Sequence, residues 1–364
     1  MLYEELIHII LIMKHNSITL IEQLTQASGL SGSEQDVASL VQTLLPESVV
    51  TEKDSIGNLT CTIKGTNEEA PTIVLASHMD EVGFMVNDIL PNGFLRISML
   101  GGWNTLTLPS SPVEIINTKG ENVRGTIGQI SPHFLKKGEP ITAPDIDDIY
   151  VDIGAVSDEN VKEEYHIEIG CLVVPISPFY HNKKSNLLFS KAFDDRIGVA
   201  ALIELAHKVT SSPISSTLIL AFTVQEEVGV RGAKVLSNYV KADIAIIVEG
   251  PPADDVPGGP ARPQTCVGKG AHVRIFDPTH IGNREILHLV TEVAKKHSLC
   301  IQKTVRKGGG TDAMELALAD KGIKTIIVGV PVRYAHSHNG ICSLSDYHEL
   351  IKLLYAIGEN TVKS

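Results

Sequence analysis

The sequence is poor in the residues that mark disulfide-rich, nucleic-acid-binding and membrane-spanning proteins. Its five cysteines are odd in number and none has CxxC spacing, so neither a disulfide framework nor a thiolate zinc site is expected. Aromatic residues make up only 5%, and 43 acidic residues outnumber 31 basic ones, which argues against a nucleic-acid surface. A reducing, cytoplasmic setting fits this cysteine usage best.

The opening apolar stretch, residues 6–13, is too short to span a membrane. Two glutamates rather than basic residues precede it, and it has no small-residue cleavage site, so it lacks the pattern of a signal peptide. We therefore expect no membrane association. Met13 is an alternative start, and whether residues 1–12 belong to the native protein stays open.

The chain shows an alternation of strands and helices that is typical of an α/β protein. The apolar run 218–224, bounded by polar residues, has the pattern of a strand buried on both faces inside a parallel sheet. Ser31 and Glu34 have the spacing of a capping box. Strands are expected at 56–65, 71–77, 218–224, 243–248 and 325–330, and helices at 17–30, 31–45, 195–210, 285–297, 311–321 and 343–360.

The stretch from about Glu81 to Pro178 has a different texture. It consists of short alternating runs separated by glycine and proline, with little helical periodicity, which predicts a small β-barrel or sandwich. The simplest architecture is one α/β domain in two sequence pieces, residues 1–80 and 179–364, with residues 81–178 as a β-rich insertion.

Acidic residues and histidines recur after the expected strands or where loops meet helices. Each has an ordinary explanation, such as a surface ion pair or a helix N-terminal charge, but an open α/β sheet collects its strand ends along one edge. Glu226 and Glu227 can serve one site only if the chain leaves the sheet there. Imidazole with carboxylate, without cysteine, suits zinc, cobalt or manganese. The candidates are His78, Asp80, Asp194, Asp195, Glu226, Glu227, Glu249 and His336.

Several motifs together resemble the M42 metallo-aminopeptidases, the glutamyl or deblocking aminopeptidases of tetrahedral assembly, some relatives of which are labelled endoglucanases. The resemblance covers nearly the whole chain from about Met13. It implies a mixed sheet of the zinc-exopeptidase type flanked by helices. The matching segments are residues 28–34, 56–59, 78–84, 125–128, 132–133, 151–155, 191–196, 225–229, 309–313 and 333–337.

The resemblance implies two divalent ions, zinc or cobalt or else manganese, bridged by Asp194. His78 and Glu249 would complete the protein ligands of one ion, and Glu227 with His336 those of the other. Many relatives have Asp at the position of Glu249, so which of its oxygens binds stays open.

The resemblance also implies roles around the ligands. Asp80 would orient His78, and Glu226 would be the general base. The peptide bond between Asp194 and Asp195 would be cis. His338 departs from the family pattern, and we expect it on the surface.

Such a centre predicts peptide hydrolysis. Two cations lower the pKa of a bridging water and polarise the scissile carbonyl, and Glu226 takes the proton of the water and returns it to the leaving amine. A free N-terminus can bind a metal, which favours removal of N-terminal residues from short peptides. The preferred first residue stays open, because it depends on loops near 250–265 and 306–312.

Two alternatives remain. One is a metal-dependent hydrolase of a non-peptide substrate such as a glycan, although glycosidases usually use two carboxylates without metal. The other is a metal-retaining scaffold without catalysis, which the presence of Glu226 and Asp80 disfavours. Chelation separates the first alternative from the peptidase if activity survives metal removal.

The insertion at 81–178 must leave and re-enter the catalytic domain beside the metals. The resemblance implies that it is a dimerisation domain and that dimers join into a hollow dodecamer. The alternative is a lid on a monomer.

Overall fold

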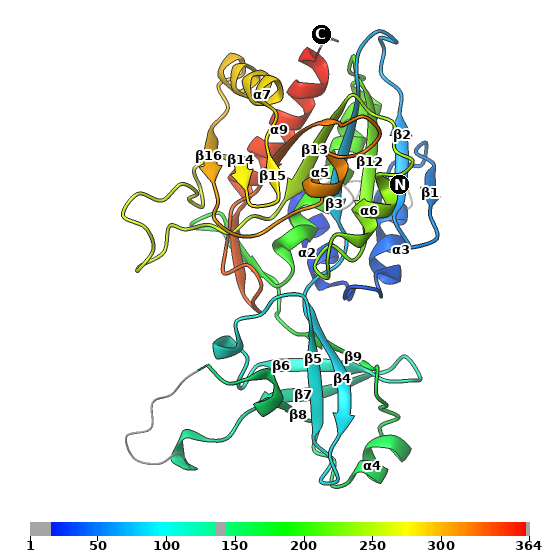
Figure 1. Cartoon of the computed structure of the whole chain (residues 1–364), viewed down its shortest axis with the longest axis vertical. Helices are drawn as coiled ribbons and strands as arrows, with labels where there is room; N and C mark the ends of the chain where they lie inside the picture. Colours follow the sequence, from blue (N-terminus) through cyan, green and yellow to red (C-terminus); the bar gives the residue numbers. More distant parts are fainter. Residues whose placement is uncertain (1–15, 135–142, 362–364) are drawn as a thin grey trace, which may run out of the picture.

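The computed structural model describes residues 16–134 and 143–361, and it shows an α/β body to which a β-barrel is attached (Figure 1). This confirms the expected fold class. The expectations about residues 1–12 lie outside the described residues. In the described part of the chain, no helix is both long enough and apolar enough to cross a membrane.

A nine-stranded mixed sheet forms the centre of the body, in the order β1-β2-β12-β3-β13-β17-β14-β15, with β16 paired to β14. β12, β3, β13 and β17 are parallel neighbours, so their carboxyl ends lie on one edge. The strands are β1 (Thr51–Lys53), β2 (Leu59–Ile63), β3 (Thr72–His78), β12 (Thr217–Thr223), β13 (Ile244–Glu249), β14 (Ala271–Asp277), β15 (His280–Ile281), β16 (Ile301–Val305) and β17 (Lys324–Gly329).

Helices cover both faces of this sheet. Because successive side chains of a strand point to opposite faces, Ile73 and Leu75 of β3 pack with α2, α3, α5, α7 and α9, whereas Val74 and Ala76 pack with α6 and α8. The helices are α2 (Ser17–Gln26), α3 (Gln35–Leu44), α5 (Phe193–Ser211), α6 (Arg231–Leu236), α7 (Arg284–Lys296), α8 (Ala313–Leu316) and α9 (Leu344–Asn360).

The β-rich stretch folds as a closed six-stranded barrel with its own apolar core. The first barrel strand, β4, begins a few residues after the end of β3. The barrel lies beyond one end of the body (Figure 1). A short helix, α4 (Asp158–Glu163), precedes its last strand. The barrel strands are β4 (Gly83–Ile89), β5 (Leu95–Leu100), β6 (Pro112–Ile116), β7 (Asn122–Gly128), β8 (Tyr150–Asp152) and β9 (Leu172–Pro175).

A second, four-stranded sheet in the order β10-β11-β19-β18 was not predicted. β11 leads into the start of α5, and the loop between β18 and β19 carries His336. The sheet therefore ties two candidate ligand segments together. Its strands are β10 (Tyr180–Asn182), β11 (Leu187–Ser190), β18 (Val332–Arg333) and β19 (Gly340–Ser343).

Two local predictions were wrong. The helix expected at 311–321 is only the short α8, and the capping box does not form. α3 begins at Gln35, and the Ser31 hydroxyl donates to Asp80 Oδ2 at 2.6 Å instead of capping a helix. Glu34 Oε1 accepts from the N–H of Gly32 at 2.7 Å. A buried partner elsewhere in the fold thus overrides the local pattern.

Candidate metal centre

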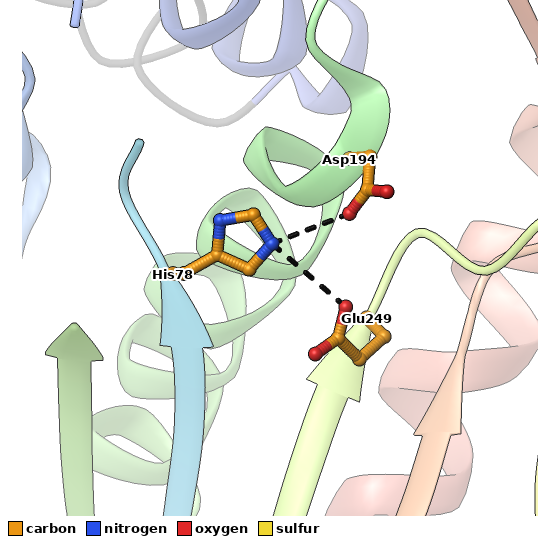
Figure 2. Close-up of side chains that lie close together, drawn as sticks. All are labelled: His78, Asp194 and Glu249. Carbon is orange, nitrogen blue, oxygen red and sulfur yellow. Dashed lines mark hydrogen bonds and ion pairs between the residues drawn. The ribbon is translucent and has the colours of Figure 1, made fainter. Parts of the chain in front are cut away.

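The carboxyl ends of the parallel strands bring the candidate ligands together. His78 is the last residue of β3, Glu249 is the last residue of β13, and Asp194 lies at the start of α5. Figure 2 shows these three side chains pointing toward one another. Glu226 and Glu227 follow the end of β12 at the same edge.

The turn after β12 directs both glutamates to one place. Gln225 has a φ of 54°, a left-handed conformation that takes the chain out of the strand direction. The backbone N–H groups of Glu226 and Glu227 then donate to the two oxygens of Asp80, at 3.0 and 3.1 Å. The chain therefore leaves the sheet at this point, which is the condition under which Glu226 and Glu227 can both serve one site.

Asp194 lies between two histidines and offers one oxygen to each. His78 Nε2 is 3.3 Å from Asp194 Oδ1 and 3.9 Å from Glu249 Oε2. His336 Nε2 is 3.3 Å from Asp194 Oδ2 and 3.2 Å from Glu227 Oε1. The geometry forms two halves that share one carboxylate.

These residues fit metal binding. Ligand atoms of Asp194 lie within 4.8 Å of those of His78 and Glu249 in one group, and of Glu227 and His336 in another. Glu227 Oε1 is buried and has His336 Nε2 at 3.2 Å, and a buried carboxylate oxygen is costly unless a proton donor or a cation binds it. Nitrogen and oxygen donors without sulfur match zinc and neighbouring divalent ions.

Asp80 and Ser31 lie behind the ligands. Asp80 is fully buried, and His78 Nδ1 lies 3.1 Å from its main-chain carbonyl and 3.5 Å from its Oδ1. Its other oxygen accepts from Ser31. One aspartate thus contacts the ring of His78 and also fixes the backbone of both glutamates.

The carboxylates and histidines of the centre shift one another's pKa values. Burial lowers the pKa of His336, but hydrogen bonds to Asp194 and Glu227 outweigh burial and raise that pKa to about 11. The pKa of His78 is also raised well above its usual value, because hydrogen bonds to Asp194 and Asp80 outweigh burial. Burial raises the pKa of Glu226, and nearby carboxylates add to this effect.

A cavity of about 570 Å³ opens over the centre. Its wall includes parts of the two loops that the sequence associated with substrate preference, and it also includes residues that the sequence did not indicate. The additional lining residues are Gly102, Val230, Arg274 and Met314.

Comparison with known proteins identifies the family. A family model described as M42 glutamyl aminopeptidase matches residues 57–353. The chain belongs to the M42 peptidase family. It is 33% identical to the glutamyl aminopeptidase of Lactococcus lactis over 340 residues, which cover 93% of this chain and 94% of the relative.

Two solved structures support the assignment. One is a TET aminopeptidase from a marine sediment Thaumarchaeota archaeon, with 34% identity, a TM-score of 0.89, and coverage of 94% of this chain and 96% of that chain. The other is the TET1 peptidase of Pyrococcus horikoshii, with 29% identity, a TM-score of 0.83, and coverage of 95% and 100%. This M42 peptidase is thus a peptide hydrolase of the aminopeptidase type, as the motifs predicted.

The peptide bond between Asp194 and Asp195 of this M42 peptidase is cis, as predicted. The two carboxylates have different surroundings. Asp195 accepts from the hydroxyl of Ser77 at 2.5 Å and from the N–H of Gly198 at 3.2 Å. It is therefore bound by the protein behind the centre, whereas Asp194 faces the histidines.

The expected surface position of His338 was wrong. Only 5% of this residue is exposed. The centroid of its ring lies 5.2 Å from that of Trp103, which lies between β5 and β6 of the barrel. Burial lowers the pKa of His338 to about 4. The sequence could not show this, because the cover comes from a segment far away in the chain.

Proposed function

We propose that this M42 peptidase is a dinuclear metal-dependent aminopeptidase that acts on short peptides and uses Glu226 as its general base. The observation that carries the proposal is the position of Asp194, whose two oxygens face His78 and His336 respectively. A shared carboxylate between two histidine halves is suited to two cations a few ångströms apart.

Each half supplies its own ligands. His78 and Glu249 with one oxygen of Asp194 would hold one zinc, cobalt or manganese ion, and His336 and Glu227 with the other oxygen would hold the second. Such ions supply an acidified water and polarise the scissile carbonyl.

Glu226 is not a ligand in either of these halves. It does form a third possible metal group with His78 and Glu227, and its Oε2 lies 4.0 Å from His78 Nε2. Burial raises its pKa, which suits a group that takes a proton from water and then gives it to the leaving amine.

The neighbouring glutamates test this assignment. We expect Glu226→Gln to keep both metal ions and its fold while turnover falls by about two to four orders of magnitude, the range for loss of a general base. Glu227→Gln removes an anionic ligand, so it should lose metal as well as activity. Metal analysis of both purified variants decides, and metal depletion of Glu226→Gln with retention by Glu227→Gln would reverse the two roles.

We further propose that the preferred N-terminal residue is acidic. The side chain of Arg274 is only 6% exposed, yet Arg274 lines the cavity. Its Nη1 donates to Asp277, and its Nε is buried with no partner in the part of the chain that the structure describes. Arg306 also lies in the cavity wall, and its Nη1 and Nη2 donate to Asp254 and to the carbonyl of Pro252, while its Nε finds no partner among the described residues. Guanidinium groups with unused donors suit a substrate carboxylate.

A pair of isosteric substrates tests the acidic preference. We expect kcat/KM for a glutamyl amide to exceed that for the glutaminyl amide by about tenfold or more, since a charged hydrogen bond contributes about 1.5–3 kcal/mol. Arg274→Met should bring this ratio toward one, whereas Arg284→Met, at an exposed position outside the cavity, should not. Equal rates on both amides in the native enzyme would contradict the proposal.

We also propose assembly into dimers and a dodecamer, with residues 81–178 as the dimerisation domain between catalytic segments 1–80 and 179–364. The structure of the Pyrococcus horikoshii relative is described as able to assemble into a tetrahedron or an octahedral shell. Large apolar side chains of the barrel region are exposed, among them Ile130 at 61% and Phe134 at 80%, and such side chains favour a contact surface. An enclosed assembly would admit short peptides and suit the cytoplasm.

A further inference from the structure

A short segment connects the barrel to one half of the metal centre. Directly after β5, Gly101 and Gly102 lie beside Glu227 and His336, the two candidate ligands of that half. A Cβ added to Gly101 would lie 3.2 Å from Glu227 Cβ, and one added to Gly102 would lie 3.4 Å from His336 Nδ1. The backbone after β5 thus lies against both candidate ligands, and a side chain at Gly101 would crowd Glu227.

Trp103, the next residue, lies between the barrel and the loop from β18 to β19 that carries His336, which we call the ligand loop. Its ring stacks on Phe84, with centroids 5.1 Å apart and planes inclined by 30°. Phe84 is fully buried in the barrel core. Trp103 also packs against His338, with centroids 5.2 Å apart. His338 follows His336 by two residues. The ring of Trp103 therefore contacts both the barrel core and the ligand loop.

The contact between Trp103 and His338 depends on packing. Nε1 of Trp103 is buried without a hydrogen-bond partner within the described ranges 16–134 and 143–361. The main chain of Pro112, in β6 of the barrel, acts on the His338 ring as a hydrogen-bonding group, but burial outweighs it and lowers the pKa of that ring. Aromatic rings at such distances attract each other through their shape and charge distribution. A ring of similar size should therefore replace either residue better than an aliphatic side chain.

The loop needs such support. Tyr334 and His336 have φ values of 60° and 57°, in a left-handed region that residues with a Cβ rarely adopt. Within the loop, Ser337 Oγ donates to the carbonyl of Tyr334 at 2.7 Å, and Ser177 donates to Asn339 Oδ1 at 3.1 Å from outside it. Residues in this region persist where surrounding structure holds them.

We propose that Trp103 is a positioning residue for the metal centre. Phe84 holds Trp103 in the barrel, and Trp103 in turn holds His338 and thereby the backbone of His336. The position of the barrel therefore determines the position of the His336 half of the centre. The other half, His78 with Glu249, is carried by strands of the central sheet and does not depend on Trp103. The proposal rests on the proposed two-ion function for the role of His336.

Trp103 is the only tryptophan of the chain, so its emission reports on this contact. We would remove metal from the full-length protein with a chelator, add zinc stepwise, and record both bound zinc and fluorescence. The emission should change while the half with His336 fills. The change should disappear in His336→Ala and persist in Glu249→Gln. An unchanged emission during binding of two ions, or its persistence in His336→Ala, would overturn the proposal.

Variants at the contact test the positioning role directly. We expect Trp103→Leu to weaken the binding of one zinc ion by about tenfold or more, the range for residues that orient a ligand, and to leave the other ion unchanged. Trp103→Phe and His338→Phe keep a ring and should restore most of the affinity. The matched control is Phe94→Leu, which removes a barrel aromatic that packs on Tyr150 at 5.0 Å instead of on the ligand loop.

The outcomes separate this inference from the proposed function. If the native protein binds fewer than two zinc ions, the two-ion function fails. If it binds two and Trp103→Leu binds both with native affinity, the positioning role fails alone. Equal weakening of both ions in Trp103→Leu, without rescue by Trp103→Phe, would show a general loss of structure and would also overturn the proposal. Thermal unfolding of each variant accompanies the titrations.

Discussion

Each histidine of the centre must lose a proton before it can bind a cation. In the metal-free protein, the pKa values of both histidines are raised, that of His336 to about 11, because hydrogen bonds to carboxylates outweigh burial. Below those pKa values the rings are protonated, and only neutral imidazole binds metal. Metal binding should therefore release protons and weaken as the pH falls.

Proton release can be counted during the zinc titration. At pH 8 in weak buffer we expect about one proton released per histidine, hence about two or more per two zinc ions, since burial also raises the pKa of the candidate ligand Glu249. His336→Ala should reduce the release by about one proton. Zinc binding with no proton release, at an affinity independent of pH, would contradict the protonated state described here.

The grouping of the candidate ligands could be predicted because their position depends on a simple rule. Polar residues after buried parallel strands meet at one sheet edge, and the structure brings His78, Glu249, Glu226 and Glu227 together there. The residues behind them could not be predicted in the same way. Ser31 and His338 find buried partners through the tertiary fold, and local patterns contain no information about those partners.

Among the elements, β13 and β17 pair at their carboxyl ends, where Gly329 lies opposite Glu249. A Cβ added to Gly329 would lie 2.1 Å from the carbonyl oxygen of Glu249 and 2.8 Å from Pro251 Cδ. No side chain fits at these distances, so the glycine allows the two strands to deliver Glu249 to the centre.

Gly329→Ala should therefore force the strands apart. We expect a loss of about 1–3 kcal/mol in the free energy of unfolding, the range for overpacking, together with lower zinc content because Glu249 is displaced. Gly308→Ala is the control, since nothing lies within 4 Å of its added Cβ. Unfolding in denaturant and metal analysis check both variants. Native stability and zinc content in Gly329→Ala would refute the close approach.

The central strands could be predicted to within a residue or two, because apolar runs buried on both faces have a clear pattern. β14 and β16 were missed, since β14 carries His272 and Arg274 among its apolar residues. Those side chains are buried, His272 between two threonine hydroxyls and Arg274 beside the cavity. Polar residues that are buried inside a strand interrupt the apolar run on which strand prediction depends.

For the whole molecule, the sequence predicted a β-rich stretch but could not distinguish a barrel from a sandwich. Alternation shows only that one face of each strand is buried. Closure depends on the pairing of β4 with β9, which come from opposite ends of the stretch. The contact of Trp103 with the ligand loop depends on how the barrel packs on the body, so it too could not be predicted.

Assembly is the last prediction, and it concerns the complete protein. Light scattering of the metal-loaded enzyme should give twelve times the 39.3 kDa mass of one chain, or about twice that mass after chelation if assembly requires metal. Phe134→Asp places a charge on an exposed apolar position of the barrel region and should reduce the mass, because a buried charge without a partner opposes association. A monomer at micromolar concentration with full activity would refute the assembly and leave the catalytic proposal intact, because all the candidate ligands come from one chain.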